Sequence, residues 1–278
     1  MKIAYIFYSD GSATSVDDEH ISLMQFLRGK GLDVHRENWD DENVDWKSYQ
    51  CIILKSPWDY VFKTQLFYQW LDKIKKLGIL LLNSADVVKW NSDKHYLQDI
   101  ADAGLKVIPT TFLERGTVFQ YSGGDELIVK PCISGSSKNT FKISGEVDPV
   151  INELLQQEAM MVQPFMPEVN EEGEWSLLFF GGKFSHALLK TPAKNDFRSQ
   201  PQFGGFVQVK EPAPEILAAA SEYVAQFAKD CLYARVDGLI INGEFYLMEL
   251  ELIDPVLFLS THEGGYENYY RALTELIC

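Results

Sequence analysis

The sequence is short of positive charge. Its 278 residues include 25 Lys and Arg against 40 Asp and Glu, which gives a formal net charge of −15 at pH 7. A protein that binds nucleic acid generally needs a basic face to neutralise phosphates, so this balance disfavours that role. It disfavours a basic, membrane-binding surface for the same reason. We therefore expect neither nucleic acid nor a membrane as a partner.

Long apolar runs and paired cysteines are also missing. No stretch approaches the ~18 apolar residues that a membrane helix requires, and the apolar run at residues 1–8 is too short for a signal peptide. The 4 cysteines, Cys51, Cys132, Cys231 and Cys278, form no CxxC pair and no zinc-finger spacing. We expect reduced cysteines and, by default, a cytoplasmic protein.

Apolar residues, in contrast, are plentiful. They make up 46% of the chain against 23% charged residues, a balance typical of a folded protein rather than a disordered one. The length allows one large domain or two to three smaller ones.

The first 85 residues alternate between strand-like and helix-like segments. The segments expected to be strands are residues 3–7, 32–35, 51–54 and 79–82. Helical spacing of apolar residues separates them, so we predict a parallel sheet with helices on its faces. Residues 83–86 are an expected linker.

The rest of the chain divides into two further sections. We expect Ser92 to be the N-cap of a helix that runs to Asp102, and strands to dominate from Glu126 onward. The predicted fold class is α/β, with α+β character in the second half of the chain. The predicted domains are residues 1–85, a central domain at 86–162 and a C-terminal domain at 163–278.

Acidic residues interrupt two neighbouring apolar strands near the C-terminus. Alternation along a strand puts Arg235 and Asp237 on one face, and Glu249 and Glu251 on one face. Two acids in an apolar run are costly unless they bind something positive, and Mg²⁺ prefers oxygen ligands. We favour a metal site over a solvated strand face.

The turn between these strands tests the metal site. A two-residue loop at Asn242–Gly243 would point Asp237 away from the two glutamates. A three-residue loop over residues 241–243, or an equivalent bulge, would bring the charged residues onto one face. We predict one of the latter two.

A lysine and a Gly/Ser loop follow a third apolar strand. Lys130 ends the run at residues 127–130 and can offer a compact cation to phosphate. The loop that follows can add backbone N–H groups, although a plain surface turn would have the same composition. The sequence contains neither a Walker A loop nor a GxGxxG fingerprint.

An aromatic turn follows the strand at residues 51–54. In open α/β sheets, ligands bind at the carboxyl ends of the strands. We expect Trp58, Asp59 and Tyr60 to shape a substrate pocket there, with a turn that packs the domain edge as the alternative.

From about residue 85 onward, the order of these features resembles the ATP-grasp family. The closest resemblance is to the branch of bacterial glutathione synthetase, the ribosomal-protein glutamate ligases and the cycloserine cyclo-ligase. The features that carry it are Lys94, Lys130 with its Gly/Ser loop, residues 163–166, Gly181–Gly182, Arg198 with Gly204–Gly205, and Arg235, Asp237, Glu249 and Glu251.

The resemblance implies a role for each position. ATP would be bound by the two lysines, the lid loop, the adenine hinge and a ribose contact. The implied ATP-binding residues are Lys94, Lys130, Ser134, Gly135, Ser136, Ser137, Gln163, Pro164, Phe165, Met166 and Glu168. Asp237, Glu249 and Glu251 would hold Mg²⁺ or Mn²⁺, and Arg198 and Arg235 would meet the γ-phosphate and the substrate carboxylate.

Three positions depart from the family pattern. Glu251 replaces the usual Asn as the last metal ligand, which makes the site more anionic. Ser176 and Lys190 stand where ligases of this branch often carry Arg. Lys190 would therefore face a substrate that differs from the precursors of glutathione.

The implied activity is ATP-dependent joining of a carboxylate to an amine through an acyl phosphate, on a small amino-acid-like substrate. The alternatives are a cyclo-ligase or kinase-like enzyme on the same scaffold, and a nucleotide-binding module without ligase activity. The sequence leaves a homodimer open.

Overall fold

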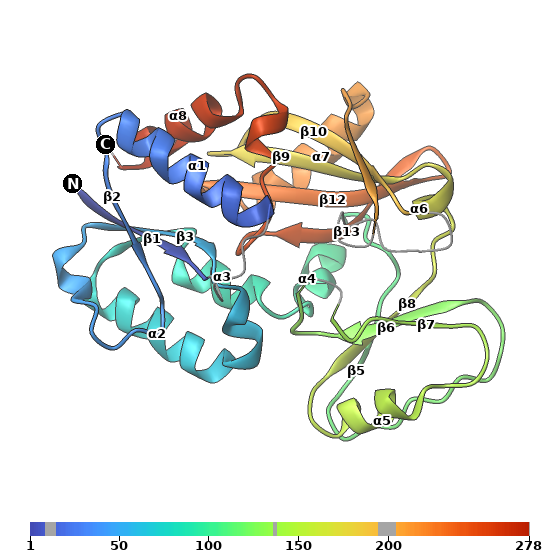
Figure 1. Cartoon of the computed structure of the whole chain (residues 1–278). Coiled ribbons are helices and arrows are strands. Elements are labelled where there is room, and N and C mark those ends of the chain that lie inside the picture. The colour runs from blue at the N-terminus through green and yellow to red at the C-terminus, as the bar shows by residue number, and fades with distance from the viewer. Residues whose placement is uncertain (9–14, 136–137, 194–203, 278) are drawn as a thin grey trace.

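Three β-sheets organise the computed structural model of the chain (Figure 1). It describes residues 1–8, 15–135, 138–193 and 204–277. Within these ranges, no helix is both long enough and apolar enough to cross a membrane. The sheets follow one another along the chain, and each is built from a different section.

The first sheet is parallel, as the sequence predicted. Its strand order is β2 (Asp33–Glu37), β1 (Lys2–Phe7), β3 (Cys51–Ser56) and β4 (Leu80–Leu82). Helix α1 (Ser15–Gly29) packs on the face of β1 that carries Ile3 and Tyr5, and α2 (Thr64–Leu77) packs on the opposite face. Apolar residues on both faces explain the uninterrupted apolar runs of β1 and β3.

The second sheet is antiparallel and belongs to the middle of the chain. Its order is β5 (Thr111–Leu113), β8 (Met160–Pro164), β6 (Leu127–Pro131) and β7 (Phe141–Ile143). Helix α5 (Pro149–Leu155) completes a small core that includes Val129 and Ile151. Figure 1 shows this green unit to one side of the rest of the chain.

The third sheet is also antiparallel and is covered on both faces. Its order is β11 (Phe206–Val209), β10 (Lys183–Thr191), β9 (Glu174–Phe180), β12 (Tyr233–Ile241) and β13 (Glu244–Glu251). Helix α7 (Pro214–Phe227) packs on the side of Leu177 and Phe179, whereas α8 (Gly265–Ile277) packs on the side of Leu178 and Phe180. The second side is shared with α1, so the first and third sheets contribute to one core.

The connection between the first and second sheets differs from the prediction. The expected linker contains Asn83, which is 1% exposed, and leads directly into α3 (Ala85–Asn91). Ser84 is the N-cap of this helix because its side chain accepts from the backbone N–H of Val87. Ser92 ends α3 instead of starting α4 (Tyr96–Asp102), since its hydroxyl donates to the Lys89 carbonyl.

The predicted domain limits remain a proposal. Each sheet has its own section of chain, in the order of the three predicted domains. The limit placed after residue 162 falls inside β8. The short helix α6 (Glu168–Glu171) then leads into the third sheet.

Candidate active site

The β12–β13 hairpin places its charged residues by means of a bulge. The turn has two residues, Asn242 and Gly243, both with positive φ, so the three-residue loop was wrong. The register then shifts: Gly238 pairs with Leu247 but Asp237 pairs with Glu249, which leaves Met248 as the extra residue. The equivalent bulge was thus the correct alternative. It puts Arg235 opposite Glu251 and Asp237 opposite Glu249.

Arg235 and Asp237 form the centre of this charged group. The Arg235 Nε and Nη2 donate to Asp237 Oδ2 at 3.1 and 2.8 Å, and Nη2 also contacts Glu251. On the neighbouring strand β9, Ser176 donates to Asp237 at 2.5 Å. A planar guanidinium can hold two carboxylates in fixed positions, so this arrangement is rigid before any ligand binds.

Lys190 extends the charged group to strand β10. Its Nζ lies 2.5 Å from Glu174 and 3.6 Å from Asp237, and the lysine is 4% exposed. Burial lowers the pKa of Lys190, but Asp237 and Glu174 outweigh it and the net direction is upward. Lys190 therefore stays charged, as its expected role against a carboxylate or phosphate requires.

The acids respond differently to the same surroundings. Burial raises the pKa of Glu251 to about 8, with Asp237 and Glu249 adding to the effect and Arg235 opposing it. Burial also acts on Glu249, but Lys94 and Lys130 outweigh it and lower its pKa. Asp237 falls to a pKa of about 2, because Arg235 and Lys190 overcome its burial. Glu251 is thus the acid that titrates near neutral pH.

A cavity of about 290 Å³ joins this group to the second sheet. At one end it is lined by apolar residues of the third sheet and the β8 hinge, namely Ile108, Pro164, Phe165, Met166, Val169, Leu239 and Met248. Gln163 also lines it, while its amide donates to Thr110 at 2.9 Å. This end suits a flat apolar ring, and the predicted residues 163–166 all reach it.

The two predicted phosphate lysines face the same cavity. Lys94 donates to the Ser134 carbonyl at 2.9 Å and lies 3.2 Å from Glu249 Oε1. Lys130 is enclosed, and burial lowers its pKa although Glu249 opposes that effect. Ser134 and Gly135 also line the cavity. Both lysines interact with Glu249, so the cavity holds cations suited to phosphates next to this acid.

The aromatic turn also contributes to the lining of the cavity. Trp58 and Tyr60 line it together with Lys190 and Arg235. Asp59 does not: its carboxylate accepts from Trp39 Nε1 at 2.8 Å and pairs with Lys63. The structure gives Asp59 a place in the core of the first unit rather than in the pocket.

Not every predicted residue that the structure describes lines the cavity. Glu168 is not part of its lining, and its Oε2 is buried with no hydrogen-bond partner among the described residues. Such an atom suits a ribose hydroxyl, which leaves the predicted role open. Arg198, Ser136 and Ser137 lie outside the residues that the structure describes.

Two asparagines in the connection between the first and second sheets form hydrogen bonds to backbone groups in and next to the strands that carry the acids. Asn83 donates to the carbonyls of Tyr233 and Leu252 at 3.0 and 2.8 Å and accepts from the N–H of Leu232 at 2.7 Å. Asn91 donates to the Leu250 carbonyl at 2.7 Å and accepts from the Leu252 N–H at 2.9 Å. The backbone on either side of Glu251 is therefore fixed by buried side chains.

The segment after β13 is held from the first unit as well. Lys55, which is 0% exposed, donates to the Pro255 carbonyl, and Glu19 accepts from the N–H groups of Leu257 and Leu259 at 2.9 and 3.0 Å. Burial lowers the pKa of Lys55 to about 8, with Glu19 opposing the shift. These contacts fix the wall of the cavity beyond the acids.

Asp254 is a cavity residue that sequence reasoning missed. It lines the cavity beside Trp58, and no described residue makes an ion pair or hydrogen bond with its carboxylate. Burial raises its pKa to about 6, with Lys55 opposing. An acid just before a proline, three residues after Glu251, was the available signal. A carboxylate in this position can accept a hydrogen bond from a substrate amine.

Asp237, Glu249 and Glu251 fit the predicted magnesium ion by their chemistry. All their donor atoms are oxygens, and Glu249 and Glu251 line the cavity next to the two phosphate lysines. Their present partners are the cations Lys94 and Arg235. Bound Mg²⁺ would take the place of these cations beside the acids, because it is also positively charged.

Two family models match the chain. The N-terminal domain of D-cycloserine synthetase DcsG matches residues 3–83, and the ATP-grasp domain of prokaryotic glutathione synthetase matches residues 106–260. Cycloserine biosynthesis protein DcsG of Streptomyces lavendulae is 27% identical over 96% of each chain. A glutathione synthetase of Rhodopseudomonas palustris is 25% identical over 76% of this chain and 67% of its own.

Solved structures agree with these matches. The crystal structure of D-cycloserine synthetase DcsG superposes with a TM-score of 0.85 at 25% identity and covers 100% of both chains. The D-alanine–D-alanine ligase of Bacillus anthracis, solved with ATP, has a TM-score of 0.69 at 16% identity over 99% of this chain and 97% of its own, which shows a common fold. Because the glutathione synthetase model matches more than half of the chain, this protein belongs to the ATP-grasp family of ligases.

Proposed function

We propose that this protein is an ATP- and Mg²⁺-dependent carboxylate–amine ligase that acts on a small amino-acid-like substrate through an acyl phosphate. The observation that carries the proposal is a single cavity lined by the apolar residues Pro164, Phe165 and Met166, by Lys94 and Lys130, and by Arg235 and Lys190. These groups suit adenine, phosphates and a carboxylate.

The first task of the site is to bring two anions together. A carboxylate that attacks the γ-phosphate of ATP is repelled, and like charges at ~4 Å cost about 4 kcal/mol at an effective dielectric near 20. Lys94, Lys130 and Arg235 would offset this repulsion. Bound Mg²⁺, held by Asp237, Glu249 and Glu251, would supply further positive charge at the phosphates.

The second task is to direct an amine to the activated carboxylate. Phosphorylation converts a poor electrophile into one with a good leaving group, and the attacking amine must be neutral and correctly placed. Asp254 lines the same cavity as Arg235. We assign it to the amine, as an acceptor of its hydrogen bond.

Cyclisation is the second candidate, because the matches to DcsG extend over both the first sheet and the rest of the chain. In that case one molecule would supply both the carboxylate and the amine. A nucleotide-binding module without chemistry is the third. A cytoplasmic location and a homodimer remain predictions.

The experiment is an ADP-release assay with Mg²⁺, ATP and pools of small acids that bear or lack an amino group. Ligation or ring closure requires stimulation by a pool, and hydroxylamine should trap the acyl phosphate as a hydroxamate. Mass spectrometry separates the two reactions: ring closure gives a product derived from one substrate, whereas ligation joins two. Tight ATP binding with no stimulated ADP release would contradict both.

A further inference from the structure

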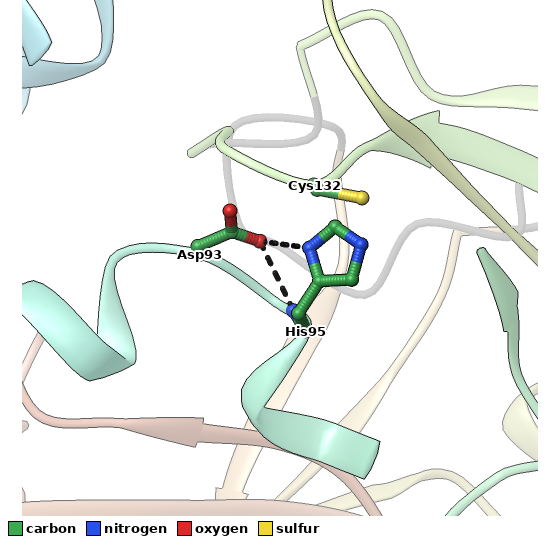
Figure 2. Close-up of side chains that lie close together, drawn as sticks. All are labelled: Asp93, His95 and Cys132. Carbon is green, nitrogen blue, oxygen red and sulfur yellow. Dashed lines mark hydrogen bonds and ion pairs between the residues drawn. The ribbon is translucent and has the colours of Figure 1, made fainter. Parts of the chain in front are cut away.

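A second cluster of ligand-type side chains lies where the chain enters α4, outside the cavity. It comprises Asp93, His95 and Cys132, and one ligand atom from each lies within 4.8 Å of the others (Figure 2). The backbone N–H of Lys94 donates to the Cys132 carbonyl at 3.0 Å, which fixes the two segments side by side. None of these three residues has a role in the proposed reaction.

Asp93 determines how the His95 ring can be used. Its Oδ1 lies 2.5 Å from His95 Nδ1 and accepts from the His95 N–H at 3.1 Å. The ring also stacks on Phe112, with centroids 4.3 Å apart. A carboxylate on Nδ1 holds the proton there and leaves a lone pair on Nε2, which is the usual arrangement for a metal-bound histidine.

His95 Nε2 has no partner for that lone pair. The atom is buried and makes no hydrogen bond to any described residue, and its nearest ionic neighbour is Glu114 Oε1 at 3.6 Å. That separation is too long for a hydrogen bond. It is close to the ~3.4 Å between two ligand atoms that each lie about 2.1 Å from a tetrahedral zinc ion.

Cys132 lies on the side of the ring away from Asp93 (Figure 2). A Cys–His–Asp group could also suggest a nucleophile, but the thiol is 1% exposed and burial raises its pKa to about 12, with Asp93 and Glu114 adding to the shift. A nucleophilic cysteine needs the opposite environment. Neighbouring carboxylates that oppose the thiolate do favour a cation that can bind it.

We propose that His95 Nε2 and Cys132 Sγ bind a divalent transition metal such as Zn²⁺, with Asp93 orienting the imidazole. Glu114 lies outside this cluster, and its exposed carboxylate, 3.6 Å from Nε2, would turn toward the ion as the third ligand. Imidazole, thiolate and carboxylate are typical zinc ligands, and a water would complete four-coordination. Binding releases the thiol proton to solvent and changes no oxidation state. Mg²⁺, which prefers oxygen ligands, does not compete.

The position of this site connects it to the cavity. Lys94 lies between Asp93 and His95, and its Nζ donates to the carbonyl of Ser134, two residues beyond Cys132. A metal bound to His95 and Cys132 joins the two segments that carry the proposed phosphate contacts. The site itself does not depend on the proposed function.

The test is a titration of the purified, reduced full-length chain with Co²⁺, which reports its ligands spectroscopically. We expect one equivalent to give the thiolate-to-metal charge-transfer absorption of a cysteine-bound ion, reversed by Zn²⁺ and unaffected by excess Mg²⁺. A wild-type chain that binds no Co²⁺, or binds it without that absorption, overturns the proposal.

Variants assign the signal to this cluster. Cys132→Ser should abolish the absorption, and His95→Asn should weaken binding by more than tenfold. Asp93→Ala should weaken it ~10–100-fold, as for other orienting carboxylates. Cys231→Ser, a buried cysteine outside the cluster, is the control. A signal that persists in folded Cys132→Ser, or disappears in folded Cys231→Ser, contradicts the site; if Cys132→Ser fails to melt cooperatively, His95→Asn and Asp93→Ala decide.

Discussion

The two walls of the cavity are built in different ways. The acidic wall, which we define as β12, β13 and residues 252–259, is held by buried side chains of the first unit and the connection, including Asn83, Asn91 and Lys55. The hinge wall, which we define as the second sheet with the loop after it, has its own small core. Backbone hydrogen bonds from Ile108 to Leu247 and from Lys94 to Cys132 join it to the rest of the chain.

This difference assigns the positioning of charges to the acidic wall and the control of access to the cavity to the hinge wall. Electrostatic stabilisation of a transition state is strongest when the charges are fixed before the reaction, since they need no reorganisation. The acidic wall meets that condition. A wall with a small core of its own can close over ATP and exclude water that would hydrolyse an acyl phosphate. We therefore expect substitutions in the two walls to affect different steps.

Substitution of Arg235 should have the largest effect on the rate. Arg235→Ala removes the cation that holds Asp237 and Glu251, so we expect ADP release with substrate to fall ~10²–10³-fold, comparable to the loss of one oxyanion donor. Arg235→Lys keeps the charge but not the planar fork, and should recover only part of the loss. The measurement is kcat/KM for ADP release, with ATP affinity measured separately.

Lys142→Ala is the control for that pair. Lys142 also carries a cation near the cavity, over the ring of Phe165 at 3.5 Å, but on the hinge wall. It should change ATP affinity more than kcat. Equal losses of kcat in Arg235→Ala and Lys142→Ala would remove the distinction between the walls.

Asn83 tests the support of the acidic wall. Asn83→Ala leaves buried groups of Tyr233, Leu252 and Leu232 without a partner, and we expect a loss of about 3 kcal/mol of unfolding free energy. Asn152 of α5, which bridges the N–H and C=O of Phe119 in the segment between β5 and β6, is the matched residue. Asn152→Ala should destabilise less and leave kcat unchanged. Denaturant unfolding measures the two losses of unfolding free energy, and hydrogen exchange shows which wall loses protection. A larger loss in Asn152→Ala than in Asn83→Ala would contradict the expectation.

The sequence predicted the elements of the acidic wall better than its supports. Alternating apolar runs located β12 and β13, and the demand that acids share a face predicted either a three-residue loop, which was wrong, or the bulge that the structure has. Side-chain periodicity of two made that inference possible. The choice between a bulge and a longer loop depends on cross-strand packing, for example around Gly238, where a Cβ would meet Phe245.

Contacts between distant segments could not be predicted in the same way. Asn83 and Asn91 lie far from Leu252 in the chain, and a polar residue after a strand is typical of a linker. The Asp93–His95–Cys132 cluster was missed because Cys132 lies far from the other two in the chain, and Asp254 was missed because the cavity that it lines is built from distant segments. Asp59 lies outside the cavity for a related reason. Its neighbours in sequence line the cavity, but its own carboxylate contacts Trp39 and Lys63 in the core.

His20 should make the stability of the first and third sheets, but not that of the second, depend on pH. It is enclosed between Tyr5 and Ser56, and burial lowers its pKa to about 2, with Lys55 adding to the shift. The unfolded chain binds a proton near pH 6.5 that the folded chain does not, so stability falls as pH drops below 6.5. The expected slope is about 1.4 kcal/mol per pH unit for this group.

His20→Gln should remove that part of the slope. His186, whose pKa burial lowers to about 4, should maintain a similar contribution in the variant. Hydrogen exchange at pH 6.5 and 5 should show lost protection in the first and third sheets but not in the second. An unchanged slope in His20→Gln, or equal loss in all three sheets, would contradict the separation of the walls.

Glu251 should give the smallest effect and tests how the acidic wall is charged. Burial raises its pKa to about 8, so it is largely protonated at pH 7 and ionises as pH rises. If the ionised form holds Mg²⁺, kcat/KM should rise about fivefold from pH 7 to 8 and then level off. Higher Mg²⁺ concentration should move this limb to lower pH, because the metal favours the carboxylate. Glu251→Asn, the residue usual in the family, should remain within tenfold of wild type at pH 8 but lose the limb, because its amide does not titrate. A pH profile of kcat/KM for both forms at two Mg²⁺ concentrations is decisive: the same limb in Glu251→Asn would assign the titration to another group, such as Asp254, whose pKa burial raises to about 6.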